Sequence, residues 1–98
     1  MIVMKFGGTS VGDADRIDNV ANIIKSCIKK KPVVVVSAVS GITDKLIELG
    51  NAAAEGKGNS ILENIKSIHY GILEKLKLDK SLIGKDIENL NSLIDNMK

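Results

Sequence analysis

The pattern of hydrophobic and polar positions in the first third of the chain predicts a strand, a helix and a second strand. A short apolar run at residues 2–6 ends at two glycines, which is typical of a buried strand that enters a tight turn. Residues 13–31 carry apolar side chains at spacings of three and four, with acids near the start and lysines at the end, and predict a helix. Pro32 is expected to stop this helix, and the unbroken valines at 33–36 predict a strand covered on both faces.

Strand, helix and strand form a βαβ unit, so the fold class is α/β with a parallel sheet. The right-handed crossover rule places the turns at residues 7–12 and 37–43 side by side, at the carboxyl edge of the sheet. Two apolar strands alone do not make a stable parallel sheet. We therefore expect an incomplete sheet, which further strands of the protein or other copies of the chain would complete.

Beyond Thr43 the pattern is helical to the end of the chain. Residues 44–55 carry a broad apolar face, and residues 56–59 are the one convincing linker. The later region, residues 59–98, contains six lysines and six acids and is expected to form a helical hairpin with solvated outer faces. The chain is thus predicted to consist of a βαβα region at 1–55 and a hairpin at 59–98.

Two local signals place the helices of the hairpin. Ser60 to Glu63 fits a capping box and opens a helix that should reach about Leu76. The last helix should begin at Lys80, or at Asp86 if Gly84 interrupts it.

Composition and charge exclude several classes of protein. The 98 residues are 44% hydrophobic and 27% charged, which describes a small folded unit or a piece of a larger one. Lys and Arg number 14 against 12 acids, so a nucleic-acid binder is not expected. No apolar run reaches the about 18–20 residues of a membrane span. A single cysteine and the lack of a signal-peptide pattern predict a cytoplasmic protein.

The turn after the first strand carries the most informative chemistry. Three glycines and two hydroxyl residues between a strand and a helix make a loop whose N–H groups can face a phosphate, in the sequence Lys5-Phe6-Gly7-Gly8-Thr9-Ser10-Val11-Gly12. A Walker A loop would continue with Lys and then Ser or Thr, but Asp13 and Ala14 follow, and the glycine spacing of a dinucleotide fingerprint is absent. What remains is a lysine before the glycines, within reach of a transferring phosphoryl group. The alternative is an ordinary glycine turn beside a solvated lysine.

The second turn, residues 37–44, repeats this theme. Its hydroxyl groups and the N–H groups at the start of the next helix can bind a carboxylate or a phosphate. The alternative is simple helix capping by Ser40, Thr43 or Asp44. Two such turns facing one crevice suggest a site for two anionic ligands, such as a nucleotide and a carboxylate. His69 has no second ligand at metal-binding spacing, so no protein metal site is expected.

Two segments resemble motifs of the aspartate kinases. The first turn, from Lys5 to Val11, resembles the opening motif of that family, and residues 34–44 resemble its second motif at the expected distance. The resemblance covers residues 1 to about 55 and implies the βαβ start of a three-layer α/β/α amino-acid kinase fold. It also implies ATP-dependent phosphorylation of the side-chain carboxylate of L-aspartate to 4-phospho-L-aspartate, the first step toward lysine, threonine and methionine. ATP, with Mg²⁺ held mainly through ATP, and L-aspartate would be the ligands, and a homo-oligomer is expected.

The resemblance also implies roles for individual residues. Lys5 would neutralise charge on the transferring phosphoryl group, and Gly7 and Gly8 would offer N–H groups to the ATP phosphates. The rest of the nucleotide loop would consist of Phe6, Thr9 and Ser10. In the second turn, Ser37 would lie near the reacting groups and Thr43 would bind aspartate.

Several family features are missing from the 98 residues. We find neither the later Gly-Glu motif nor the substrate-clamping arginine, and Arg16, in the predicted first helix, matches neither. The chain is therefore expected to be the amino-terminal part of an aspartate kinase catalytic domain, inactive alone. The alternatives are a non-catalytic nucleotide- or anion-binding module and an oligomerisation scaffold.

Overall fold

The computed structural model describes residues 1–97, and Lys98, where the predicted hairpin ends, lies outside the described residues. The chain packs as two compact units, the first unit at residues 1–43 and the second unit from residue 44 onward. The helix that follows Thr43 therefore packs with the later helices. The division of the chain at the linker, residues 56–59, stays a prediction from the sequence. No helix within residues 1–97 is long and apolar enough to cross a membrane.

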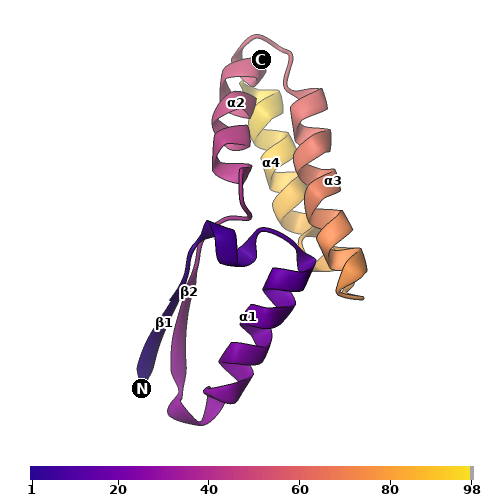
Figure 1. The fold of residues 1–98 in the computed structure, drawn as a ribbon. Coiled ribbons are helices and arrows are strands. Elements are labelled where there is room, and N and C mark those ends of the chain that lie inside the picture. The colour runs from indigo at the N-terminus through magenta and orange to yellow at the C-terminus, as the bar shows by residue number, and fades with distance from the viewer. Residues whose placement is uncertain (98) are drawn as a thin grey trace. The chain divides into compact units, whose positions relative to one another are not determined.

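The first unit is a βαβ element, as predicted. Strands β1 (Ile2–Phe6) and β2 (Pro32–Val36) pair in parallel, with Ile2 opposite Pro32 and Phe6 opposite Val36. Helix α1 (Ala14–Ser26) connects them and runs alongside the strands in Figure 1. A parallel pair needs such a long crossover, because the chain must return to the edge where the first strand began.

Helix α1 ends earlier than its apolar periodicity predicts. Its N-cap is Asp13, whose Oδ1 accepts a hydrogen bond from the Arg16 backbone N–H at 2.9 Å. The helix stops at Ser26, and a 3₁₀ turn, η2 (Ile28–Lys30), leads into Lys31 at φ 51°. The prediction of a helix to residue 31, stopped by Pro32, is wrong at this end. The chain has to reverse here so that Pro32 can begin β2 beside β1.

The sheet is incomplete, as expected. On β1, Ile2, Met4 and Phe6 are half-buried, whereas the alternating Val3 and Lys5 are exposed. The four valines of β2 are 37–57% exposed, so the prediction of a strand covered on both faces is wrong for this structure. Two strands and one helix leave a sheet face and both edges of the ladder open.

The second unit is helical. Helix α2 (Ile42–Ala54) enters it at Asp44 and is followed by α3 (Asn59–Lys75), the 3₁₀ turn η3 (Lys80–Leu82) and α4 (Gly84–Asn96). In Figure 1, α3 and α4 run in opposite directions, which agrees with the predicted hairpin. The buried side chains of this unit are Leu49, Ala53, Leu62, Ile65, Leu73 and Ile94.

The turn between α2 and α3 is shaped by close packing at Gly58. A Cβ atom on this residue would lie 3.1 Å from Leu49 Cδ1 and 3.4 Å from Ala53, so the α2 side chains occupy the space that a larger residue would need. Gly58 is also the N-cap of α3 and makes no side-chain cap bond, and Ser60 lies inside the helix. The predicted capping box is therefore wrong, because the tight turn starts the helix before Ser60.

The last helix begins at neither of the two predicted residues, Lys80 and Asp86. A 3₁₀ turn comes first, and the α-helix begins at Gly84 itself, two residues before Asp86. Asp79 caps this turn by accepting a hydrogen bond from the Ser81 N–H at 2.8 Å. This backbone hydrogen bond, aided by the Ser81 side chain, holds the pKa of Asp79 below its usual value.

We expect Leu49→Ala to destabilise the chain by about 2–5 kcal/mol, because the change leaves a cavity in the second unit. Leu49 is 2% exposed, whereas Ile47 on the same helix is 61% exposed. The matched change Ile47→Ala should therefore stay within about 0.5 kcal/mol of the wild type. Urea unfolding followed by circular dichroism measures the free energy of unfolding of both variants. An equal loss of stability in the two would contradict the placement of Leu49 in the core.

Candidate functional site

The two glycine- and hydroxyl-rich turns meet at the carboxyl edge of the sheet. The Ser37 N–H donates a hydrogen bond to the Phe6 carbonyl at 3.1 Å, one step beyond the paired strands. A Cβ atom on Gly8 would lie 3.6 Å from Ser37 Oγ, and one on Gly12 would lie 3.4 Å from Ser40 Cβ. The structure thus brings the two turns into contact, as the crossover rule predicts.

The first turn exposes backbone donors in a compact form. Gly7 is extended, with φ −76° and ψ 176°, and residues 8–11 form the 3₁₀ helix η1 (Gly8–Val11). The Ser10 N–H donates to the Gly7 carbonyl at 3.0 Å and is therefore occupied. The N–H groups of Gly8 and Thr9, at the start of a helical turn, have no partner within it. They are the backbone donors that this turn offers to an anion.

Lys5 lies next to the end of β1, opposite Val35. Its side chain is exposed, and it makes no hydrogen bond or ion pair within residues 1–97. A solvated surface lysine has the same exposure, so exposure alone does not make Lys5 a site residue. It is a candidate because of the turn that follows it. An ammonium group without a protein partner is free to bind an anionic ligand.

The second turn presents free hydroxyl groups. The side chains of Ser37, Ser40 and Thr43 are exposed and make no hydrogen bond in the described part of the chain. Gly41, at φ 82°, allows the turn, and the Ile42 N–H donates to the Val39 carbonyl as α2 begins. No hydrogen bond within residues 1–97 therefore supports the alternative in which this turn only caps the helix. Thr43 is the second residue of α2 and makes no hydrogen bond with the first turn in the described part of the chain.

Sequence reasoning missed Arg16 as part of this region. Its Nη1 donates a hydrogen bond to the Thr9 carbonyl at 2.8 Å, and its Nε lies 3.8 Å from Asp13 Oδ2. A Cβ atom on Gly12 would lie 3.7 Å from the same Nη1. The one available signal was its position three residues after the N-cap, from which a long side chain can reach back over the turn.

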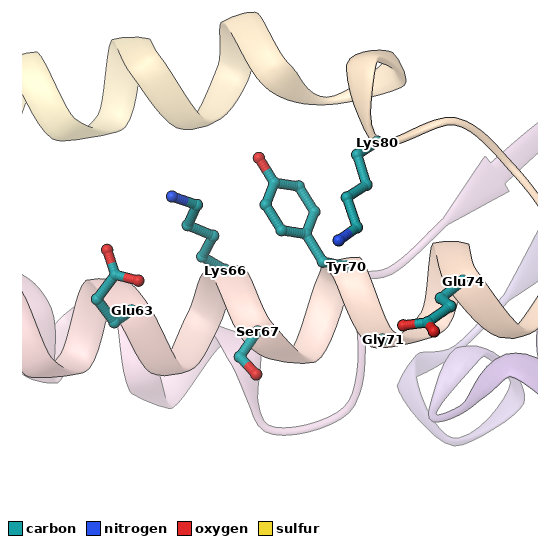
Figure 2. A pocket seen from close by; sticks show the side chains of 7 residues that line it. All are labelled: Glu63, Lys66, Ser67, Tyr70, Gly71, Glu74 and Lys80. Carbon is teal, nitrogen blue, oxygen red and sulfur yellow. The ribbon is translucent and has the colours of Figure 1, made fainter.

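A hollow in the second unit is lined by residues of α3 and by Lys80 of η3 (Figure 2). Tyr70 stands between two lysines, with Lys66 Nζ 5.8 Å and Lys80 Nζ 5.4 Å from the ring centroid. Glu63 and Glu74 line the same hollow, so its two cations are balanced by two acids. This balance agrees with the solvated surface predicted for the hairpin and gives the hollow no preference for an anion.

Metal-ligand chemistry finds no support in the described residues. Within residues 1–97, no three side chains of His, Cys, Asp or Glu come together so that they could hold an ion. The His69 Nδ1–H donates a hydrogen bond to the Ile65 carbonyl at 2.7 Å, inside its own helix. These residues do not fit a Mg²⁺ site made of protein ligands, so we derive no step through a protein-bound metal.

Comparisons with known proteins identify the family to which the chain belongs. A profile described as the amino acid kinase family matches residues 1–92. The chain is 36% identical over 97 residues to "Aspartokinase 2, chloroplastic" of Arabidopsis thaliana, covering 94% of this chain and 18% of that protein. It is 38% identical over 90 residues to "Lysine-sensitive aspartokinase 3" of Escherichia coli (strain K12), covering 92% of this chain and 20% of that protein.

A solved structure shows the same fold. The crystal structure of E. coli aspartokinase III in complex with aspartate and ADP matches with a TM-score of 0.75 and 32% identity, over 99% of this chain and 22% of that one. The chain thus spans about a fifth of the length of these relatives. The predicted fold class and the resemblance to aspartate kinases are confirmed, and the chain belongs to the amino acid kinase family.

Proposed function

We propose that this chain supplies the phosphate loop of an aspartate kinase, which transfers the γ-phosphoryl group of ATP to the side-chain carboxylate of L-aspartate. The observation that carries the proposal is the close approach of Gly8 to Ser37, whose Oγ would lie 3.6 Å from a Cβ atom on Gly8. This approach brings the free N–H groups of the first turn next to the free hydroxyls of the second. The solved relative that matches nearly the whole chain was crystallised with aspartate and ADP. Two neighbouring turns suit two anionic ligands of this kind.

In the proposed reaction, a carboxylate oxygen of aspartate attacks the γ-phosphorus, and the bond to the bridging oxygen of ADP breaks. The nucleophile is already ionised, so no general base is required. The residues of the chain then act by charge and position. Lys5 neutralises charge on the phosphoryl group, and the N–H groups of Gly8 and Thr9 hold phosphate oxygens. Ser37 lies near the reacting groups, and Thr43 binds aspartate.

The other parts of the nucleotide loop have supporting roles in this proposal. Gly7, extended and with open space around its Cα, lets phosphate approach the backbone. Phe6 anchors the loop to the second turn through its carbonyl, and Ser10 closes the helical turn. Mg²⁺ would reach the site bound to ATP, because the residues described here do not fit a metal site of their own.

The proposal extends to the organisation of the protein. Residues 1–98 would form the amino-terminal part of the catalytic domain, with the phosphate loop within 1–55 and a helical hairpin at 59–98. The open valine face of β2 supports a complete enzyme with more sheet than two strands, assembled as a homo-oligomer. The enzyme would act in the cytoplasm, at the first step toward lysine, threonine and methionine.

We expect Lys5→Ala, in the whole protein that carries this chain, to lower kcat by roughly 10²–10³-fold, because a positive charge is lost where charge moves in the transition state. The KM for aspartate should change little. A coupled ADP-release assay at saturating ATP and aspartate measures the change. Lys30→Ala removes another exposed lysine, in η2, and should keep wild-type kcat. Unchanged turnover in Lys5→Ala would contradict a catalytic role of Lys5 and favour a scaffold role for this chain.

The isolated 98-residue chain should show no turnover of aspartate and ATP, because it spans about a fifth of its relatives. Substituting residues 1–97 for the segment they match in E. coli aspartokinase III should in contrast give an active chimera. The same chimera with Lys5→Ala should lose activity by the same factor as the whole protein. Turnover by the isolated chain would contradict the first expectation, and a folded but inactive chimera would contradict the second. Tight ATP binding by the isolated chain without turnover would instead indicate a nucleotide-binding module.

A further inference from the structure

Arg16 joins the start of α1 to the phosphate loop. Its Nη1 donates a 2.8 Å hydrogen bond to the Thr9 carbonyl, seven residues back along the chain. Asp13 supports it from two sides, because its Oδ1 accepts the Arg16 backbone N–H at 2.9 Å and its Oδ2 lies 3.8 Å from Nε. The guanidinium is thus tied both to the helix N-cap and to the loop. It is the only arginine in the chain, and no step of the proposed reaction uses it.

This contact holds one peptide group at both ends. The Thr9 carbonyl and the Ser10 N–H belong to the same planar peptide unit. Arg16 binds the carbonyl, and the Gly7 carbonyl accepts the hydrogen bond of the N–H at 3.0 Å. The plane between Thr9 and Ser10 therefore has little freedom to rotate. The Gly7 carbonyl shares its own peptide plane with the Gly8 N–H, so the same hydrogen bond also orients that donor. The Thr9 N–H belongs to the peptide unit between these two held units.

The surroundings leave room for this contact. Gly12 stands where the loop joins α1, and a Cβ atom there would lie 3.6 Å from the Thr9 carbonyl oxygen and 3.7 Å from Arg16 Nη1. The side chain of Arg16 is 59% exposed, so water competes for the guanidinium. A charged donor makes a stronger hydrogen bond than a neutral one, and the neighbouring Asp13 restricts the rotamers that the arginine can adopt.

We propose that Arg16 is a positioning residue for the nucleotide: by holding the Thr9 carbonyl, it orients the free N–H groups of Gly8 and Thr9 toward the phosphates of ATP. The inference rests on the proposed function and deepens it. Arg16 acts through the loop and not on the reacting atoms. Misplacing the loop would then weaken nucleotide binding and slow phosphoryl transfer, while the aspartate side of the site is spared.

The test is Arg16→Met in the whole protein that carries this chain. We expect the KM for ATP to rise and kcat to fall by about tenfold each, with the KM for aspartate within about twofold. Arg16→Lys, which can still donate to the Thr9 carbonyl, should recover part of both. Hydrogen exchange without nucleotide should be faster at the Ser10 amide, whose turn has loosened, and unchanged at the Ser37 amide, which bonds to Phe6.

Two further variants separate the possible outcomes. Lys25→Met removes a positive charge from the last turn of α1 and should leave the KM for ATP and the exchange at Ser10 unchanged. Asp13→Asn keeps an N-cap but loses the carboxylate beside Nε, and should give a weaker form of the Arg16→Met effect. Asp13→Asn also keeps the inference falsifiable if Arg16→Met does not fold.

Three results would overturn the positioning role. The first is wild-type kinetics in Arg16→Met. The second is an equal rise in KM for ATP and aspartate. The third is weaker ATP binding with unchanged exchange at Ser10, which would mean that Arg16 contacts the nucleotide itself. A wild-type protein without aspartate kinase activity would overturn the proposed function instead, and the exchange at Ser10 would still decide whether Arg16 holds the loop.

Discussion

Parallel pairing of β1 with β2 is the constraint on which the candidate site depends. Because both strands run in the same direction, both carboxyl ends reach the same edge, and each is followed there by its turn. The hydrogen bond from the Ser37 N–H to the Phe6 carbonyl continues the ladder one step past Val36. It sets the level at which the second turn leaves the sheet, so that Ser37 faces Gly8. A shift of one residue in register would turn this side chain to the other face.

The elements with a strong local pattern could be predicted from the sequence, whereas their ends and surroundings could not. The valine run predicts a strand correctly, but it indicates only that the side chains favour burial and not what would bury them. Apolar spacing continues through Ile28, yet this residue is 60% exposed, because the reversal toward β2 ends α1 first. The residues from Ser60 to Glu63 have the types of a capping box, but they do not cap the helix. Packing between Gly58 and Leu49, residues nine apart in the sequence, decides where α3 begins.

The same distinction applies to the candidate site. The meeting of the two turns follows from topology, so the sequence could predict it without any side-chain detail. Arg16 could not be found in this way, because its partner is the backbone carbonyl of Thr9 and every residue type has one. Comparing motifs draws attention to side chains that would touch a substrate. A residue that binds the backbone of a loop has no such motif, and its position in a helix indicates only that it could reach the loop.

In the first unit, some polar groups are held by hydrogen bonds and others are free. This division explains how a short loop could bind phosphate. The groups that define its shape are paired, namely the Ser37 N–H with Phe6 and the Thr9 carbonyl with Arg16. The groups that would face a ligand in the proposed reaction, such as the Lys5 ammonium, are exposed and unpaired within residues 1–97. Water satisfies them in the free protein, so leaving them open costs little stability. A phosphate can replace that water without rearranging the backbone, which is what phosphoryl transfer by positioning requires.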